Sequence, residues 1–166
     1  MANSPRLNVL IALSDLLKTM TPANGWDYDL SAAVFRGRSR FDETDPDTMV
    51  SILEAPKPDY GFAVAELGSQ RKEEWNLLLQ GWCPDDGEHP TDNAHEFMWA
   101  VEQLLNKVIA IDGNSGKERF PNEYLLGRRI SSFAFGPGVV RPPTEGISSK
   151  AFFYLPVRIG LVTSNG

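Results

Sequence analysis

The sequence contains very little of several residue types on which common protein chemistries depend. It has one cysteine, Cys83, among 166 residues, so no disulfide can form within the chain and stability must come from packing. We interpret Cys83 as a small apolar residue of a strand. No apolar run approaches the roughly 20 residues that span a bilayer, and the first residues lack the basic region and cleavage site of a signal peptide. These absences predict a protein that is made and folded in a cytoplasm and has no membrane partner.

Basic residues are in the minority, with 16 lysines and arginines against 22 aspartates and glutamates and a net charge of −6. Nucleic-acid-binding proteins gain affinity mainly by neutralising phosphates, so this balance argues against a dedicated DNA or RNA binder. It is compatible with a protein past which DNA slides without being gripped. With 42% hydrophobic and 23% charged residues, the composition is that of a globular protein. The length suits a single domain over residues 1–166.

Motifs for catalysis and for metal or cofactor binding are absent or incomplete. His95 and the glutamate after it resemble the start of a zinc-protease helix motif, but Trp99 stands where the second histidine belongs. Residues 113–117 resemble a phosphate-binding loop, yet their glycines are too close together and Glu118 replaces the magnesium-binding hydroxyl. The acidic turn at 84–88 lacks the alternating ligands of a calcium loop. The sequence therefore predicts no catalytic residue, no cofactor site and no metal site, and we expect that the protein is not an enzyme.

The spacing of apolar residues predicts two main helices and five strands. Ser4 and the proline after it combine a capping hydroxyl with a residue suited to the first helical turn, and Thr21-Pro22 ends the helix that follows. A second helix begins at Thr91 or Asp92. The order α-β-β-β-α-β-β predicts an α+β fold, in which two main helices pack on one face of a mostly antiparallel sheet. The expected strands cover residues 30–36, 48–54, 74–83, 130–135 and 152–163.

Two of these elements carry specific expectations of burial. The odd-numbered residues of 153–161 are apolar and alternate with others, which predicts that they face the second helix. Pro156 cannot donate a hydrogen bond to a neighbouring strand, so its strand is expected at an edge, or paired on only one side at that point. In the second helix, Met98, Trp99 and Ile109 widen the apolar stripe. This width predicts a helix that is buried on more than one side.

A long loop insertion at about 55–72 separates the second and third expected strands. It opens on two closely spaced prolines and carries the aromatic residues Tyr60 and Phe62. Loops of this length in small domains are usually functional or disordered. We expect Tyr60 and Phe62 to be exposed and to contact a partner or a neighbouring subunit.

Three arginines at alternate positions, Arg36, Arg38 and Arg40, form the most suggestive charged group. Side chains two residues apart share a face of an extended segment, so we expect the three guanidinium groups to line up. Acidic residues follow at 42–47. The row is predicted to pair with carboxylates of the same or an adjacent subunit, so that Arg38→Glu weakens assembly and leaves the monomer's fold intact. A solvated strand end explains the same residues equally well, and direct DNA binding is a third interpretation.

Three stretches of the sequence resemble a family of small phage proteins that cap the tail tube where it meets the head. The first is the opening amphipathic helix with the strand at 30–38, and the second is the strand at 75–82. The third is the acidic turn that leads into residues 90–95 and their helix. The likeness to these tail terminators and minor tail proteins covers about residues 1–112. It lies in the order of the segments and in their general residue composition.

The resemblance implies a structural virion protein that forms a six-fold ring, stops polymerisation of the tail tube and joins the tail to the head. The implied partners are other copies of the chain, the tail-tube protein and the head connector or neck protein. DNA would pass through the ring without specific binding. The family has no catalytic residues to transfer to this chain. The implied location is the head-proximal end of the tail in the virion, after assembly in the host cytoplasm.

The sequence leaves other functions open. A phage neck or head-completion protein would also form a ring, but it would contact the portal side of the joint. A monomeric α+β adaptor module and an enzyme with an unfamiliar site belong to different classes. Size-exclusion chromatography with light scattering separates the two ring-forming proteins from these two, because a ring has a multiple of the 18.4 kDa chain mass.

Overall fold

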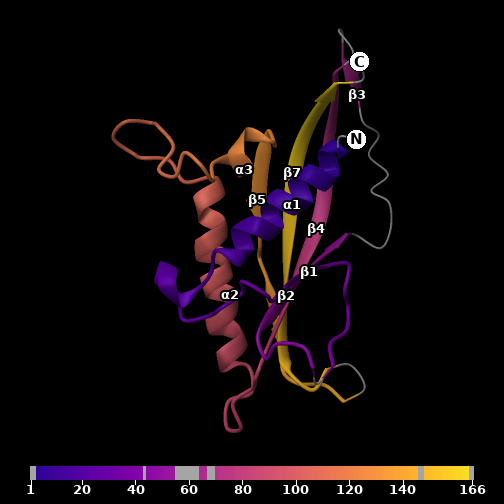
Figure 1. The fold of residues 1–166 in the computed structure, drawn as a ribbon, viewed down its shortest axis with the longest axis vertical. Helices are drawn as coiled ribbons and strands as arrows, with labels where there is room; N and C mark the ends of the chain where they lie inside the picture. The colour runs from indigo at the N-terminus through magenta and orange to yellow at the C-terminus, as the bar shows by residue number, and fades with distance from the viewer. Residues whose placement is uncertain (1–2, 43, 55–63, 67–69, 146–147, 165–166) are drawn as a thin grey trace.

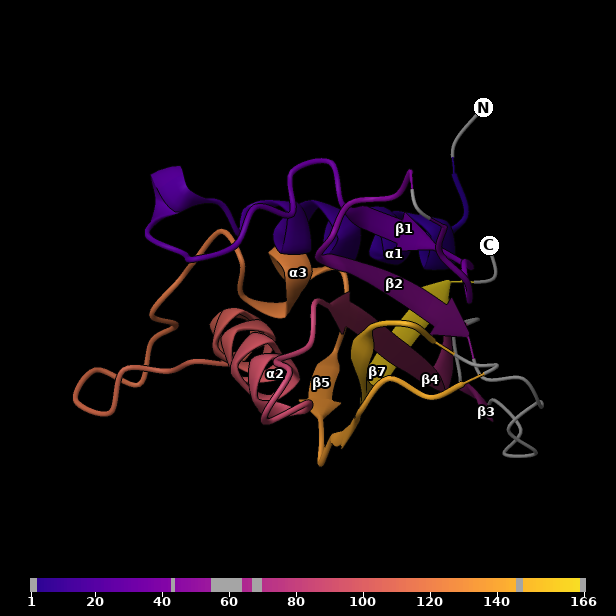
Figure 2. The same ribbon diagram turned by 90° about the horizontal axis from the view of Figure 1, so that it is seen from below.

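Helices cover one side of a single twisted sheet in the computed structural model. Helix α1 (Pro5–Lys18) crosses in front of the strands, and α2 (Asp92–Leu105) runs beside them along the long axis of the molecule (Figure 1). Seen after a 90° turn, the other side of the sheet carries loops (Figure 2).

The residues Tyr60 and Phe62, which were predicted to contact a partner, lie outside the described part of the chain. The structure describes residues 3–42, 44–54, 64–66, 70–145 and 148–164.

The two main helices begin where the sequence predicts. The Leu7 backbone N–H donates a hydrogen bond to the Ser4 hydroxyl at 3.1 Å, which caps α1 and satisfies one of the amides that lack a partner at a helix start. Helix α2 follows Thr91 and continues as a single 3-10 turn, Asn106–Val108. A further 3-10 turn, Pro22–Asn24, follows the end of α1.

A third helical turn, α3 (Leu125–Arg128), is left-handed. Its residues have φ values from +50° to +71°, a conformation that costs roughly 1–2 kcal/mol for each residue other than glycine. Two contacts hold the turn in place: the Leu126 side chain is buried next to α1, and the Arg129 guanidinium donates to the Leu126 carbonyl at 2.9 Å. The spacing of apolar residues did not predict this turn.

Seven strands form one sheet within the described residues. The order across the sheet is β1-β2-β4-β7-β5, with β3 paired to β4 and β6 paired to β7. Strand β1 runs parallel to β2, and the other pairs are antiparallel. The predicted α+β class and mostly antiparallel sheet are confirmed, and β3 and β6 are additions to the expected order. The strands are β1 Val34–Arg36, β2 Met49–Glu54, β3 Val64–Glu66, β4 Gln70–Cys83, β5 Ser132–Phe135, β6 Val139–Arg141 and β7 Ala151–Ser164.

The central strands β4 and β7 pair over their whole length, from Gln70 opposite Ser164 to Cys83 opposite Ala151. Successive residues of a strand point to opposite faces of the sheet, and burial alternates between Glu74 and Leu79 of β4 and between Phe153 and Ile159 of β7. We call the side covered by α1 and α2 the helix face and the other side the open face. As predicted, the odd-numbered apolar residues of 153–161 lie on the helix face and are buried.

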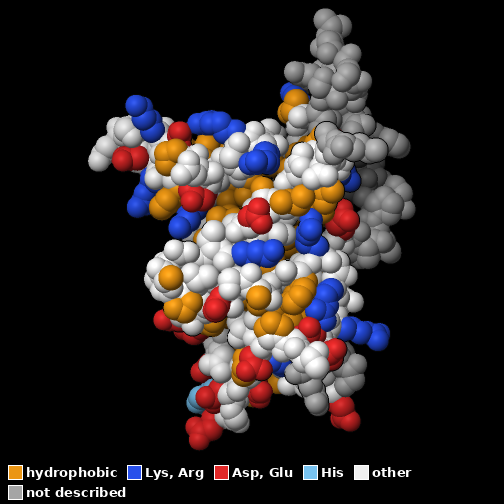
Figure 3. Space-filling view, viewed as in Figure 1, with side chains coloured by type: hydrophobic (Ala, Val, Ile, Leu, Met, Phe, Trp, Pro, Cys, Tyr) orange, Lys and Arg blue, Asp and Glu red, His pale blue; other side chains and the backbone are white. Residues whose placement is uncertain are grey.

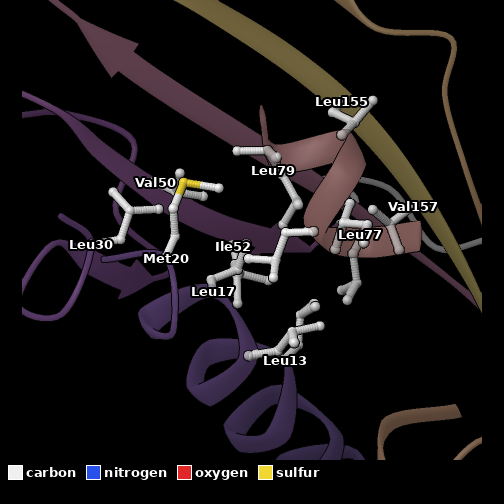
Figure 4. Packing of buried hydrophobic residues seen from close by; sticks show 14 of the residues in the cluster. Leu13, Leu17, Met20, Leu30, Val50, Ile52, Leu77, Leu79, Leu155 and Val157 are labelled. Atoms are coloured by element: carbon white, nitrogen blue, oxygen red, sulfur yellow. The ribbon is translucent and has the colours of Figure 1, made fainter. Parts of the chain in front are cut away.

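The core fills the space between the helices and the helix face. Leu13 and Leu17 of α1 lie close to Ile52 of β2 and Leu77 of β4 (Figure 4). Burying an aliphatic side chain of this size contributes about 1.5–3 kcal/mol relative to leaving it exposed. This part of the fold is therefore stabilised by apolar packing.

Aromatic rings join α2 to the sheet. The Phe97 ring of α2 meets the Phe153 ring of β7 edge to face at 5.4 Å between centroids. Phe153 lies over Gly81 on the neighbouring strand, where a β-carbon would come within 2.2 Å of the ring. The glycine thus provides the room that the Phe153 ring needs.

The first predicted strand is shorter than expected. The structure has strand geometry only from Val34 to Arg36, not from residue 30. The Leu30 N–H donates to the Met20 carbonyl at 2.8 Å, and the Asp29 carboxylate accepts from both the N–H and the hydroxyl of Ser31. These local bonds form a turn that competes with strand pairing.

The expected loop at 55–72 is partly strand. Residues 64–66 form β3 and pair with 70–72, which extends β4 beyond its predicted start at residue 74.

The prediction for Pro156 left two possibilities, an edge strand or a strand paired on one side at that point, and one-sided pairing is confirmed. The Pro156 carbonyl accepts a hydrogen bond from the Gly136 N–H at 2.9 Å. The nitrogen and the carbonyl of a strand residue point toward the same neighbouring strand, so the Pro156 nitrogen, which carries no hydrogen, faces the break between β5 and β6.

Candidate functional site

The open face of the sheet contains a broad hollow. Its volume is about 1020 Å³, and it lies between the β1–β2 loop and the β6–β7 loop. Its floor is formed by side chains of β2, β4 and β7, and its walls come from the two loops. The residues that line it include Arg40, Phe41, Leu53, Leu78, Gln80, Trp82, Glu145, Ser148 and Tyr154.

The floor of this hollow combines apolar and polar groups. The Gln80 amide donates to the Tyr154 hydroxyl at 3.3 Å, so these two polar side chains satisfy each other. At one end, the Phe41 ring meets the Trp82 ring edge to face at 5.9 Å and covers that end of the sheet. Beyond this covered end the floor is accessible. The lining thus mixes aromatic and aliphatic side chains with polar ones such as Arg40 and Glu145.

The predicted arginine row does not line up. Strand β1 ends at Arg36, and Gly37 has a φ of +78°, which breaks the alternation along the chain. The Arg38 guanidinium lies over the Phe35 ring at 4.5 Å, and Phe35 points to the face opposite that of Arg36. Arg36 and Arg40 are exposed, and only Arg40 borders the hollow. The sequence argument failed because it assumed that the extended conformation continued beyond Arg36.

Arg38 forms a two-point ion pair with Asp45 of the same chain. Its two terminal nitrogens lie 2.9 Å and 2.6 Å from the two carboxylate oxygens, a geometry that gives strong, directional pairing. This pair raises the pKa of Arg38, and together with the Asp42 N–H it lowers the pKa of Asp45. Arg38 therefore fixes the β1–β2 loop. Pairing with a carboxylate of the same chain is one of the two possibilities predicted for Arg38, and Arg38→Glu would remove this ion pair from the loop.

Helix α2 is buried on one side only within the described chain. Trp99 is 60% exposed, and beyond the helix Ile109 and Ile111 are 38% and 53% exposed. The expectation of burial on more than one side, which rested on Met98, Trp99 and Ile109, is therefore wrong for this single chain. The periodic pattern of a helix identifies its apolar positions, but it does not show whether other residues of the same chain pack over them. We call the outer side of this helix the acidic helix surface, formed by Asp92, His95, Glu96, Trp99 and Glu102.

A second exposed surface lies on the open face of β5, β6 and β7. Its residues share one face by register, with Ala134 opposite Arg158 and Arg141 opposite Phe152. Val139 is 48% exposed. Sequence reasoning missed this surface, although the alternation of β7 assigned Arg158 to the side away from the helices. We call it the basic strand surface, formed by Ala134, Val139, Arg141, Pro156 and Arg158.

Charge is unevenly distributed over the molecule. Acidic side chains gather at the end where β4 turns into α2, and many basic side chains lie toward the other half of the view (Figure 3). The acidic end contains the turn at 84–88, in which the Asp86 carboxylate accepts from the N–H groups of Glu88 and His89. These bonds lower the pKa of Asp86 and keep it ionised. The turn is a solvated, negatively charged tip, as its sequence indicated.

Potential metal ligands do not cluster among the described residues. They contain no group of three or more His, Cys, Asp or Glu side chains that could hold a metal ion. Cys83 is buried, and burial raises the pKa of its thiol to about 11, so it is un-ionised and inert at neutral pH. Both His89 and His95 are exposed. Among the described helices, none has the length and apolar character needed to cross a membrane.

Comparison with known proteins places the chain in no family. No protein-family model matches it, and no curated protein matches it.

Proposed function

We propose that the protein is a structural component of a phage virion that assembles into a ring at the head-proximal end of the tail tube. One observation carries this proposal. The chain presents two different exposed surfaces with apolar centres, one on α2 and one on the open face, on opposite sides of the helix–sheet layers. Contacts between unlike surfaces of identical chains produce rings when the rotation closes.

The assignment to the tail rests on the resemblance of residues 1–112 to tail terminators. In that role the ring stops polymerisation of the tail tube, contacts the tube protein on one side and the head connector on the other, and has six subunits. The net charge of −6 fits a passage through which DNA moves without being held.

The test combines the purified full-length chain with tail-tube subunits of the same phage. We expect six-fold rings at the ends of tubes in electron micrographs, shorter tubes as the protein is added, and ring masses that are multiples of 18.4 kDa. Binding to connector subunits but not to tubes would instead indicate a neck protein. A chain that stays monomeric with both partners would contradict ring formation.

A further inference from the structure

The exposed side of α2 and the open face of the sheet have complementary features. We propose that the acidic helix surface of one copy packs on the basic strand surface of the next copy, so that each α2 lies between two sheets. This inference rests on the proposed function, because it specifies the contact from which the ring is built.

The first argument is the apolar content of α2. Its inner side packs on the sheet of its own chain through Phe97, while Trp99 on the outer side is 60% exposed. The other residues of the outer side are polar, so Trp99 is an isolated large apolar side chain at the centre of this surface. Trp99 is also a residue type that commonly anchors protein interfaces. A second protein surface would remove the exposed Trp99 ring from water.

The second argument is charge. Helix α2 contains Asp92, Glu96 and Glu102 and has no lysine or arginine. Strands β5, β6 and β7 contain Arg141 and Arg158 and have no aspartate or glutamate. Neither arginine has an ion-pair partner among the described residues. Opposite charges on the two surfaces favour their contact and disfavour contact of either surface with itself.

The third argument is the layer structure. The helix face of β7 is covered by α2 of its own chain, whereas Val139 and Pro156 on the open face of the same strands are exposed. Placing a neighbouring α2 there would cover these exposed residues with a second layer, as an apolar sheet surface requires. Because the two surfaces lie on opposite sides of the molecule, each copy uses one for each neighbour. The contact is heterologous, as a ring requires.

A charge exchange tests the contact. Glu96→Arg and Arg158→Glu should each weaken assembly of the full-length chain about tenfold or more, because each brings like charges together. The two changes combined in one chain should restore most of the assembly. Asp15→Arg, on the exposed side of α1, is the matched control and should assemble like the wild type. Sedimentation velocity over a concentration series, with and without tail tubes, measures assembly.

A second variant tests the apolar centre. Trp99→Ala should reduce assembly at least as much as either charge variant, while its circular dichroism and melting temperature stay close to those of the wild type. Normal assembly by Trp99→Ala, or single charge variants that assemble like the wild type, would overturn this contact and leave the ring itself standing. A wild-type chain that forms no ring in solution or on tubes would overturn the proposed function as well.

Discussion

The two faces of one sheet are completed in different ways. On the helix face, Phe153 and Ile159 of β7 are fully buried in the core that α1 and α2 cover. On the open face, Pro156 and Arg158 of the same strand are exposed. These residues are sequence neighbours, so position along the chain does not explain the difference. The comparison separates the packing that a single chain completes by itself from the surface that stays exposed in it.

The forces on the two faces differ as well. Leucine, valine and phenylalanine side chains join the helix face to α1 and α2, and their stabilisation scales with the apolar area that they bury. The cover over one end of the open face is a loop, held by the Arg38–Asp45 pair and by the contact of Phe41 with Trp82. Ion pairs near solvent contribute little to global stability. Substitutions on the two faces should therefore differ sharply in effect.

The largest expected difference concerns neighbouring residues of β7. Ile159→Ala or Val157→Ala should lower the free energy of unfolding by about 2–5 kcal/mol, because each change leaves a cavity in the core. Arg158→Ala, on the open face, should change it by no more than about 0.5 kcal/mol. Urea denaturation of the three variants measures the contrast. Losses below about 0.5 kcal/mol for both core variants would mean that the strand register is shifted by one residue.

A smaller effect is expected from crowding of the same core. Gly81→Ala places a β-carbon within 2.2 Å of the Phe153 ring, and overpacking of this kind typically costs about 1–3 kcal/mol. Phe153→Leu in the Gly81→Ala background should recover part of the loss, since the two positions are in contact. A thermodynamic double-mutant cycle checks this coupling. Additive effects would show that the ring moves aside freely and that the glycine is not required.

Local signals allowed most of the fold to be predicted. Ser4 caps α1 through a bond to the third residue after it, and the alternation of 153–161 depends only on strand geometry. The length of β1 was not predictable in the same way, because the Asp29–Ser31 turn competes with pairing. Strand β6 is three residues long and exists through its pairing with β7. Three residues are too few to show the alternation of apolar and polar side chains by which a strand is predicted from sequence.

The candidate surfaces were harder to predict, because exposure is a property of the whole fold. Trp99 has the same apolar character as the core residues of α2, and only the packed structure shows that it lies outside. Arg38 was predicted to pair with a carboxylate of the same or an adjacent subunit, and the structure shows that its partner, Asp45, lies seven residues along the same chain. One signal was available: the residues three positions before and after Trp99 are Glu96 and Glu102, which is unusual for the buried side of a helix.

Acid should loosen the cover of the open face before it disturbs the core. The pKa of Asp45 is lowered by hydrogen bonds from Arg38 and from the Asp42 N–H, and the pKa of Asp42 is lowered by Thr44. A group with a lowered folded-state pKa stabilises the fold above its unfolded pKa, about 3.9 for aspartate. That contribution is lost as the pH falls through the lower, folded value.

The smallest effect that we predict is therefore a local transition in acid. Between pH 5 and pH 2, the amide signals of Asp42 and Thr44 in an NMR titration should shift with a midpoint below about 3.9, because their hydrogen bonds require ionised carboxylates. Core amides such as that of Leu79 should remain unchanged through this step. Asp45→Asn, which keeps the shape but not the charge, should remove the part of the Asp42 amide shift that comes from the Asp45 carboxylate and leave the core stable. A pH midpoint at or above about 3.9, or simultaneous loss of the core signals, would show that the Arg38–Asp45 pair does not hold its loop independently of the helix face.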